Sequence, residues 1–206
     1  MAEFVKLYEK DTNPKALKLV TECFLDGGVV IYPTDTVYAV GCDINSRSAI
    51  EKVARIKNIK VKDANFSFVF YDLSQISEYT KQFNSSTFKI LKRNLPGPYT
   101  FILQANNSIP KLFRNKKRTL GIRVPDNAIC RTIVNSLDYP IISTSIYDED
   151  EVIEYTTDPE LIFEKYQNQV DMVVDGGYGK NIASTVVDLS SGEVEIIRQG
   201  VGELLL

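Results

Sequence analysis

The chain has 206 residues, of which 44% are hydrophobic and 25% charged, a composition that is ordinary for one soluble globular domain. It contains no histidine, which excludes Ser-His-Asp and Cys-His nucleophile systems and histidine-ligated metal sites. Its three widely spaced cysteines argue against structural zinc and a disulfide framework. The net charge of -3 argues against a dedicated RNA-coating protein, and the lack of a long apolar run or a signal peptide predicts no membrane association and a cytoplasmic location.

In chain order, the first predicted element is a helix that starts at Asn13 and Pro14, where a capping side chain precedes a proline. A Gly-Gly pair ends this helix, and the apolar run 29–32 after it predicts a buried strand. Pro33 cannot donate to a sheet ladder and therefore ends the strand. Ser46 is the expected cap of a second helix.

Periodicity and turn residues place the other elements along the rest of the chain. The further helices are expected at 86–93, 128–137 and 159–166, and the further strands at 66–71, 99–104, 120–124, 140–143, 170–174, 185–189 and 194–197. Helices alternate with strands early in this order, and a hairpin closes it. The sequence therefore predicts the α/β class, with a mixed sheet in one domain.

The turn after the first strand carries the most polar chemistry beside the predicted core. It reads Thr34-Asp35-Thr36, and ligands collect at strand ends in open α/β sheets. The hydroxyls of this turn either bind a ligand or cap the end of the strand. Asp35 is expected to orient the turn.

The segment 27–41, with its Tyr-Pro-Thr-Asp-Thr core, resembles the signature of the YrdC/YciO family, the threonylcarbamoyl-adenylate synthase-like proteins. Five further segments match in the family's order: Leu-Pro-Gly-Pro-Tyr-Thr at 95–100, Gly-Ile-Arg-Val-Pro at 121–125, Ser-Thr-Ser at 143–145, Ser-Thr-Val-Val-Asp at 184–188 and Arg-Gln-Gly at 198–200. The amino-acid sequences of these segments are most similar to the YciO-like branch of the family. The resemblance implies a single twisted mixed-sheet domain of the YrdC type over residues 1–206, with a concave face and no extra C-terminal domain.

The resemblance also implies an activity. Family members join L-threonine, bicarbonate and ATP into threonylcarbamoyl-adenylate and pyrophosphate, a nucleotidyltransferase reaction linked to threonylcarbamoyladenosine modification of tRNA. Mg2+ is expected to accompany the nucleotide. An alternative is a YciO-type enzyme that acts on a related carbamoyl or adenylate compound.

Residue by residue, the resemblance implies a substrate-binding turn and an anion-handling wall. Thr34 and Thr36 match the threonine-binding turn, and Lys57 and Arg123 match residues expected to act in catalysis. The expected nucleotide-binding residues are Lys57, Thr119, Arg123, Ser143, Ser145, Ser184 and Arg198, and no metal ligand is expected. Residues 119 and 123 are four apart on a predicted strand and should face the same side.

Several positions depart from the family's pattern. Ile59 replaces the arginine of a Lys-x-Arg motif, which removes a bidentate anion contact, and a nearby cation (Arg55, Lys60 or Lys62) could substitute for it. Ser145 replaces an asparagine, and Asn127 stands where many relatives have histidine. Four consecutive acids at 148–151 would repel a triphosphate, and they form either an exposed loop or a metal-binding segment.

The resemblance also implies an alternative function of a different class, RNA binding without catalysis. Family members have been associated with double-stranded RNA and tRNA. The observation that favours it is a basic run of residues 111–118 that contains Phe113. A solvated surface explains such a run equally simply. The segment 175–181 lacks the spacing of a P-loop, so we reject a Walker-type ATPase.

Overall fold

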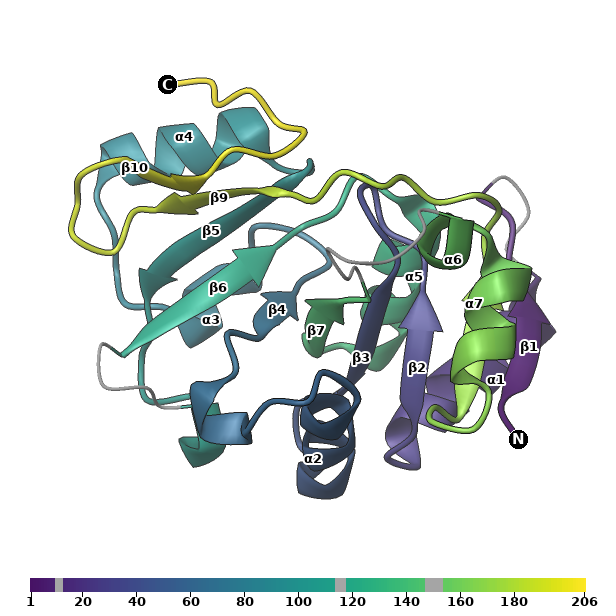
Figure 1. The fold of residues 1–206 in the computed structure, drawn as a ribbon. Helices are drawn as coiled ribbons and strands as arrows, with labels where there is room; N and C mark the ends of the chain where they lie inside the picture. The colour runs from purple at the N-terminus through teal and green to yellow at the C-terminus, as the bar shows by residue number, and fades with distance from the viewer. Residues whose placement is uncertain (10–12, 114–117, 147–153) are drawn as a thin grey trace.

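A twisted sheet of ten strands runs through the computed structural model, which describes residues 1–9, 13–113, 118–146 and 154–206 (Figure 1). The strands are β1 (Glu3–Lys6), β2 (Val29–Tyr32), β3 (Ala39–Asp43), β4 (Ser67–Val69), β5 (Tyr99–Gln104), β6 (Thr119–Arg123), β7 (Ile141–Ser145), β8 (Met172–Asp175), β9 (Thr185–Asp188) and β10 (Glu195–Arg198). Their order across the sheet is β1-β8-β2-β3-β7-β4-β6-β5-β9-β10, with parallel and antiparallel neighbours interspersed. The predicted mixed α/β sheet is confirmed.

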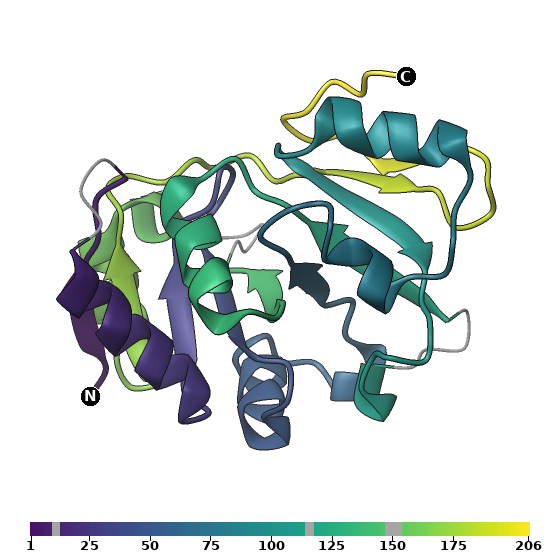
Figure 2. The same cartoon turned by 180° about the vertical axis from the view of Figure 1, so that it is seen from behind.

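Helices cover both faces of this sheet. They are α1 (Pro14–Leu25), α2 (Arg47–Ile56), α3 (Ile76–Tyr79), α4 (Ser85–Asn94), α5 (Ala128–Leu137), α6 (Glu154–Thr157) and α7 (Pro159–Tyr166), with short 3-10 turns η1 (Val61–Asp63) and η2 (Lys111–Phe113). Figure 2 shows α1 and α5 side by side on one face, whereas α2 and α7 lie on the other face in Figure 1. None of the helices in the described part of the chain has both the length and the apolar character that a bilayer crossing requires.

Side-chain caps explain where the longer helices begin. Asn13 and Ser46 accept hydrogen bonds from backbone N–H groups of the first turns of α1 and α2, as the sequence predicts, and Asp158 does the same for α7. Asn84 caps α4 in the same way. Asn127 caps α5 by accepting from the Cys130 N–H at 2.9 Å, so this side chain has a local structural role.

Two strands, β1 and β3, are absent from the sequence prediction. β3 contains alanine and glycine, which have little intrinsic β preference, and it follows a turn that reads as irregular. Its five residues are nevertheless all buried between β2 and β7, so packing overrides propensity. β1 is a short strand at the edge of the sheet and pairs with β8 alone. The predicted strands agree with the observed ones to within about two residues at each end.

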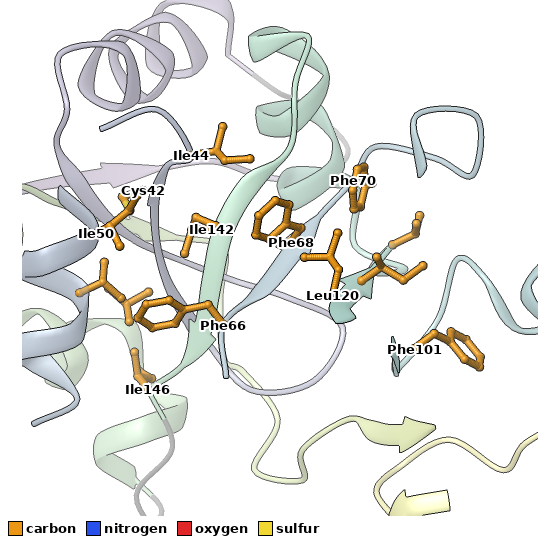
Figure 3. Packing of buried hydrophobic residues seen from close by; sticks show 14 of the residues in the cluster. Cys42, Ile44, Ile50, Phe66, Phe68, Phe70, Phe101, Leu120, Ile142 and Ile146 are labelled. Carbon is orange, nitrogen blue, oxygen red and sulfur yellow. The ribbon is translucent and has the colours of Figure 1, made fainter. Parts of the chain in front are cut away.

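The core has two parts, one on each face of the sheet, and β2 contributes to both. Val29 and Ile31 belong to one hydrophobic cluster, whereas Val30 and Tyr32 belong to the other. This alternation is why a strand without a polar face reads as a continuous apolar run. Figure 3 shows the larger cluster, in which aromatic side chains of the central strands such as Phe68 meet aliphatic residues of neighbouring elements.

Candidate functional site

A cavity of about 690 Å³ opens over the middle of the sheet, within the range of small-molecule sites. Its walls come from segments far apart in sequence: the turn after β2, η1, β4, β5, η2, β6, β7, and the ends of β9 and β10. Ser143, Ser67 and Gly121 pair in register across three adjacent strands and therefore face the same side. These three small residues lie among the cavity residues and leave room above the sheet.

Arg123 is the most constrained cation of the cavity. One of its Nη atoms donates to Asp35 Oδ1 at 2.9 Å and to Thr36 Oγ1 at 3.0 Å. The arginine is 6% exposed and Asp35 8%, so this is a buried ion pair. Arg123 Nε is also buried and has no hydrogen-bond partner among the described residues. A buried donor without a partner is costly, and this one belongs to a side chain that lines a cavity.

The turn that carries Asp35 is held by its own hydrogen bonds. Thr34 Oγ1 donates to the Val37 carbonyl at 2.7 Å and accepts from the Thr36 N–H at 3.1 Å. Asp35 Oδ2 accepts from the Asp126 N–H at 3.0 Å, which ties the turn to the segment after β6. The carboxylate therefore fixes both the turn and the guanidinium, as the sequence analysis expects for its orienting role.

The opposite wall is built around Ser184, at the start of β9. Its hydroxyl lies 2.9 Å from Thr100 Oγ1, and its carbonyl accepts from Arg198 Nη2 at 2.8 Å and Nε at 3.3 Å. Gly200 allows the chain to approach here, because a Cβ at this residue would lie 2.2 Å from the Ala183 carbonyl oxygen. Backbone packing thus holds Arg198 against Ser184 at the cavity.

The structure brings together seven of the nine site residues expected from the sequence. Those that line the cavity are Thr36, Thr119, Arg123, Ser143, Ser145, Ser184 and Arg198. Thr34 and Lys57 are not among the lining residues: Thr34 supports the turn, and Lys57 follows the last residue of α2 as its C-cap. The acids at 148–151 and the basic residues at 114–117 lie outside the described residues.

The lining residues that the sequence does not predict as site residues include Lys62, Ser67, Thr100 and Phe113. The sequence could have indicated Ser67 as a site residue, because a serine between two phenylalanines interrupts an otherwise apolar strand. Of the three cations that could substitute for the arginine absent at Ile59, Lys62 is the one that lines the cavity. Phe113 packs edge-on against Phe68 with ring centroids 5.3 Å apart, a contact between segments that sequence spacing cannot reveal.

The comparisons with known proteins identify the family and the fold. Residues 22–200 match the Sua5/YciO/YrdC family model, which is described as "Telomere recombination". The chain belongs to the Sua5/YciO/YrdC family. Over 206 residues it is 35% identical to the uncharacterized YciO of Escherichia coli strain K12, covering 99% of this chain and 98% of that protein. The E. coli YciO crystal structure covers 98% of both chains with a TM-score of 0.90, which confirms the predicted fold.

Other members of the Sua5/YciO/YrdC family have names that state an activity or a ligand. Threonylcarbamoyl-AMP synthase of Nitrosococcus oceani is 30% identical over 129 residues, which is 63% of this chain and 69% of that protein. The crystal structure of P. abyssi Sua5 complexed with L-threonine matches 96% of this chain and 57% of that chain with a TM-score of 0.84. At 20% identity this second likeness shows the shared fold.

The family's activity raises the question of a metal. Asp63 is the one carboxylate among the described lining residues. No group of three or more His, Cys, Asp or Glu side chains in the described ranges is arranged to hold a metal ion. The described residues therefore do not fit a resident Mg2+ site, and we derive no step through one.

Proposed function

We propose that this protein is a threonylcarbamoyl-AMP synthase-type enzyme that uses L-threonine, bicarbonate and ATP. The amine of threonine and bicarbonate form a carbamate with loss of water. A carbamate oxygen then attacks the α-phosphorus of ATP, the bond to the β-phosphate bridging oxygen breaks, and pyrophosphate leaves. The product would serve threonylcarbamoyladenosine modification of tRNA.

The observation that carries this proposal is the unpartnered Nε of Arg123. An arginine that is 6% exposed, and is already oriented by Asp35 and Thr36, lines the cavity and has one donor without a described partner. Charge-assisted hydrogen bonds to carboxylate or phosphate oxygens are the strongest use of such a donor. The reaction needs positioned anions more than proton transfer, which suits a chain without histidine.

The other lining residues support the same chemistry. Hydroxyls dominate the polar part of the wall: Thr36, Ser67, Thr100, Thr119, Ser143, Thr144, Ser145 and Ser184. Hydroxyls donate to anionic oxygens without adding a charge that must be neutralised when the site is empty. Lys62 and Arg198 add positive charge at the cavity, where the phosphates of ATP, with Mg2+ as their counter-ion, would be held.

Pyrophosphate release from ATP tests the proposal directly, with L-threonine and bicarbonate each omitted in turn. Release that requires all three substrates is the expected result. If the full mixture releases none and calorimetry detects no ATP binding, the synthase proposal is wrong. Release that depends on ATP and bicarbonate but not on threonine would point to a related carbamoyl or adenylate substrate.

Lys62→Ala should raise the KM for ATP about tenfold and leave kcat within about twofold, because a hydrogen bond that involves a charged group contributes ~1.5–3 kcal/mol net, and exposure places Lys62 at the low end of that range. Lys62 is exposed and lines the cavity, so the effect should shrink as salt is added. The matched control is Lys60→Ala, an exposed lysine two residues away that is outside the lining. Equal effects of the two variants would remove Lys62 from the site.

A second candidate, RNA binding, is favoured by the distribution of charge along the chain. Residues 79–125 contain ten of the 24 basic residues and none of the 27 acidic ones. The remaining residues therefore hold 14 basic and 27 acidic side chains. This segment includes α4, where Lys89 and Lys92 are exposed. Such a basic region could contact the phosphates of double-stranded RNA or tRNA although the whole chain is acidic.

Reversing the charge of α4 should weaken RNA binding if this candidate is right. For the double variant Lys89→Glu and Lys92→Glu, we expect at least a tenfold loss of affinity for a 20-base-pair RNA duplex and a shallower dependence of log Kd on log salt. The control is Lys15→Glu with Lys18→Glu, two exposed lysines of α1 outside the basic segment. A wild-type affinity that does not vary with salt would contradict the candidate.

A further inference from the structure

Tyr32, in the strand before the turn 34–36, reaches the cavity wall across one face of the sheet, because the strand pairing puts Tyr32, Gly41 and Ser143 on the same side. Its ring lies against Gly41 of the neighbouring strand β3, where a Cβ would be 2.9 Å from a ring carbon and 3.1 Å from the phenol oxygen. Past this glycine, the Tyr32 hydroxyl donates to Ser143 Oγ of β7 at 2.8 Å. Tyr32 is fully buried and Ser143 nearly so, which shields the hydrogen bond from bulk water.

The direction of this hydrogen bond determines what Ser143 can do. A buried phenol needs an acceptor, and within the described residues Tyr32 donates to Ser143. Burial raises the pKa of Tyr32 far above its usual range, so the phenol keeps its proton and remains a donor. The Ser143 oxygen accepts this bond, and no described residue accepts the proton of Ser143 in turn. That proton is therefore available to a ligand in the cavity that Ser143 lines.

We propose that Tyr32 is a positioning residue that holds the Ser143 hydroxyl as a hydrogen-bond donor to a phosphate oxygen of ATP. The inference rests on the proposed function, which puts the nucleotide in this cavity. Ser143 shares a sheet face with Gly121, and Arg123 lies two residues further along the same strand on that face. The serine proton and the guanidinium thus serve anionic oxygens from the same side, and Gly41 is the residue whose lack of a side chain makes the arrangement possible.

A double-mutant cycle in the pyrophosphate-release assay tests this role. Tyr32→Phe keeps the ring and removes the donor, and we expect the KM for ATP to rise about five- to tenfold while the KM for L-threonine and kcat stay within about twofold. Ser143→Ala should raise the KM for ATP about tenfold or more. Adding Tyr32→Phe to Ser143→Ala should not raise the KM for ATP further, because the phenol acts through the serine hydroxyl.

The control is Tyr139→Phe, which removes a 2.8 Å hydrogen bond to Asp43 away from the cavity. This variant should leave kcat and both KM values unchanged.

The outcomes separate the inference from the proposed function. Wild-type kinetics in Tyr32→Phe would overturn the positioning role alone, since the wild type would still release pyrophosphate. A further loss when Tyr32→Phe is added to Ser143→Ala would also overturn it, because the effect would then come from packing. A wild type that releases no pyrophosphate would overturn the proposed function, and the inference with it.

Discussion

Arg123→Ala should reduce ATP- and threonine-dependent pyrophosphate release at least about 100-fold, the size of loss seen when an oriented donor to a developing anion is removed. The guanidinium lines the cavity, its Nε has no partner among the described residues, and Thr36 and Asp35 fix its orientation. No other described residue presents a buried cation there. The measurement is the initial rate at saturating substrates, with ATP binding followed by calorimetry.

The single variant also leaves Asp35 buried without its partner, which costs about 3–5 kcal/mol of stability. Loss of activity could then reflect unfolding, so the decisive variant is Arg123→Met combined with Asp35→Asn. Replacing both charges of a buried pair by neutral side chains of similar volume is often nearly neutral for stability. We expect a melting temperature close to that of the wild type and no measurable turnover. Retained turnover in this folded double variant would exclude Arg123 from the site.

The elements of the fold could be predicted where local sequence decides the structure. The caps Asn13 and Ser46 and the helix and strand periods are local signals, and α5 and α7 begin and end where the sequence predicts. The order of strands in the sheet is not local. β3 lies between β2 and β7 although its sequence reads as a continuation of the polar turn, and only its burial on both sides makes it a strand.

The same division applies to the candidate site. Lining residues that lie in a matched family motif, such as Arg123 and Ser184, could be predicted from the sequence. The contacts that give those residues their properties join distant strands: Asp35 to Arg123, Thr100 to Ser184, and Tyr32 to Ser143. No spacing rule connects residues 88 or 111 positions apart. The position of Lys62 at the cavity is likewise a result of how η1 meets the cavity.

Filling the cavity from below should abolish substrate binding without harming the fold. Gly121 lies in β6 among the cavity residues, and a Cβ there would lie 3.3 Å from Ser67 Oγ and 3.6 Å from Thr100 Cγ2. Gly121→Ala therefore fits with a small shift, whereas Gly121→Leu must extend into the cavity. Along the series Ala, Val, Leu we expect ATP affinity to fall progressively, by about 100-fold for leucine, since the added side chain occupies cavity volume that the ligand needs.

The melting temperature should move in the opposite direction to affinity in this series. Glycine in a strand is unfavourable by about 0.5–1 kcal/mol relative to alanine, and β-branched valine suits a strand better still. The control is Gln104→Leu, which adds a similar side chain on the same sheet face but outside the lining, and it should leave ATP affinity unchanged. Unchanged affinity in Gly121→Leu, with the fold intact, would show that the nucleotide binds elsewhere. A stable variant that loses affinity would locate binding above Gly121 independently of any charged residue.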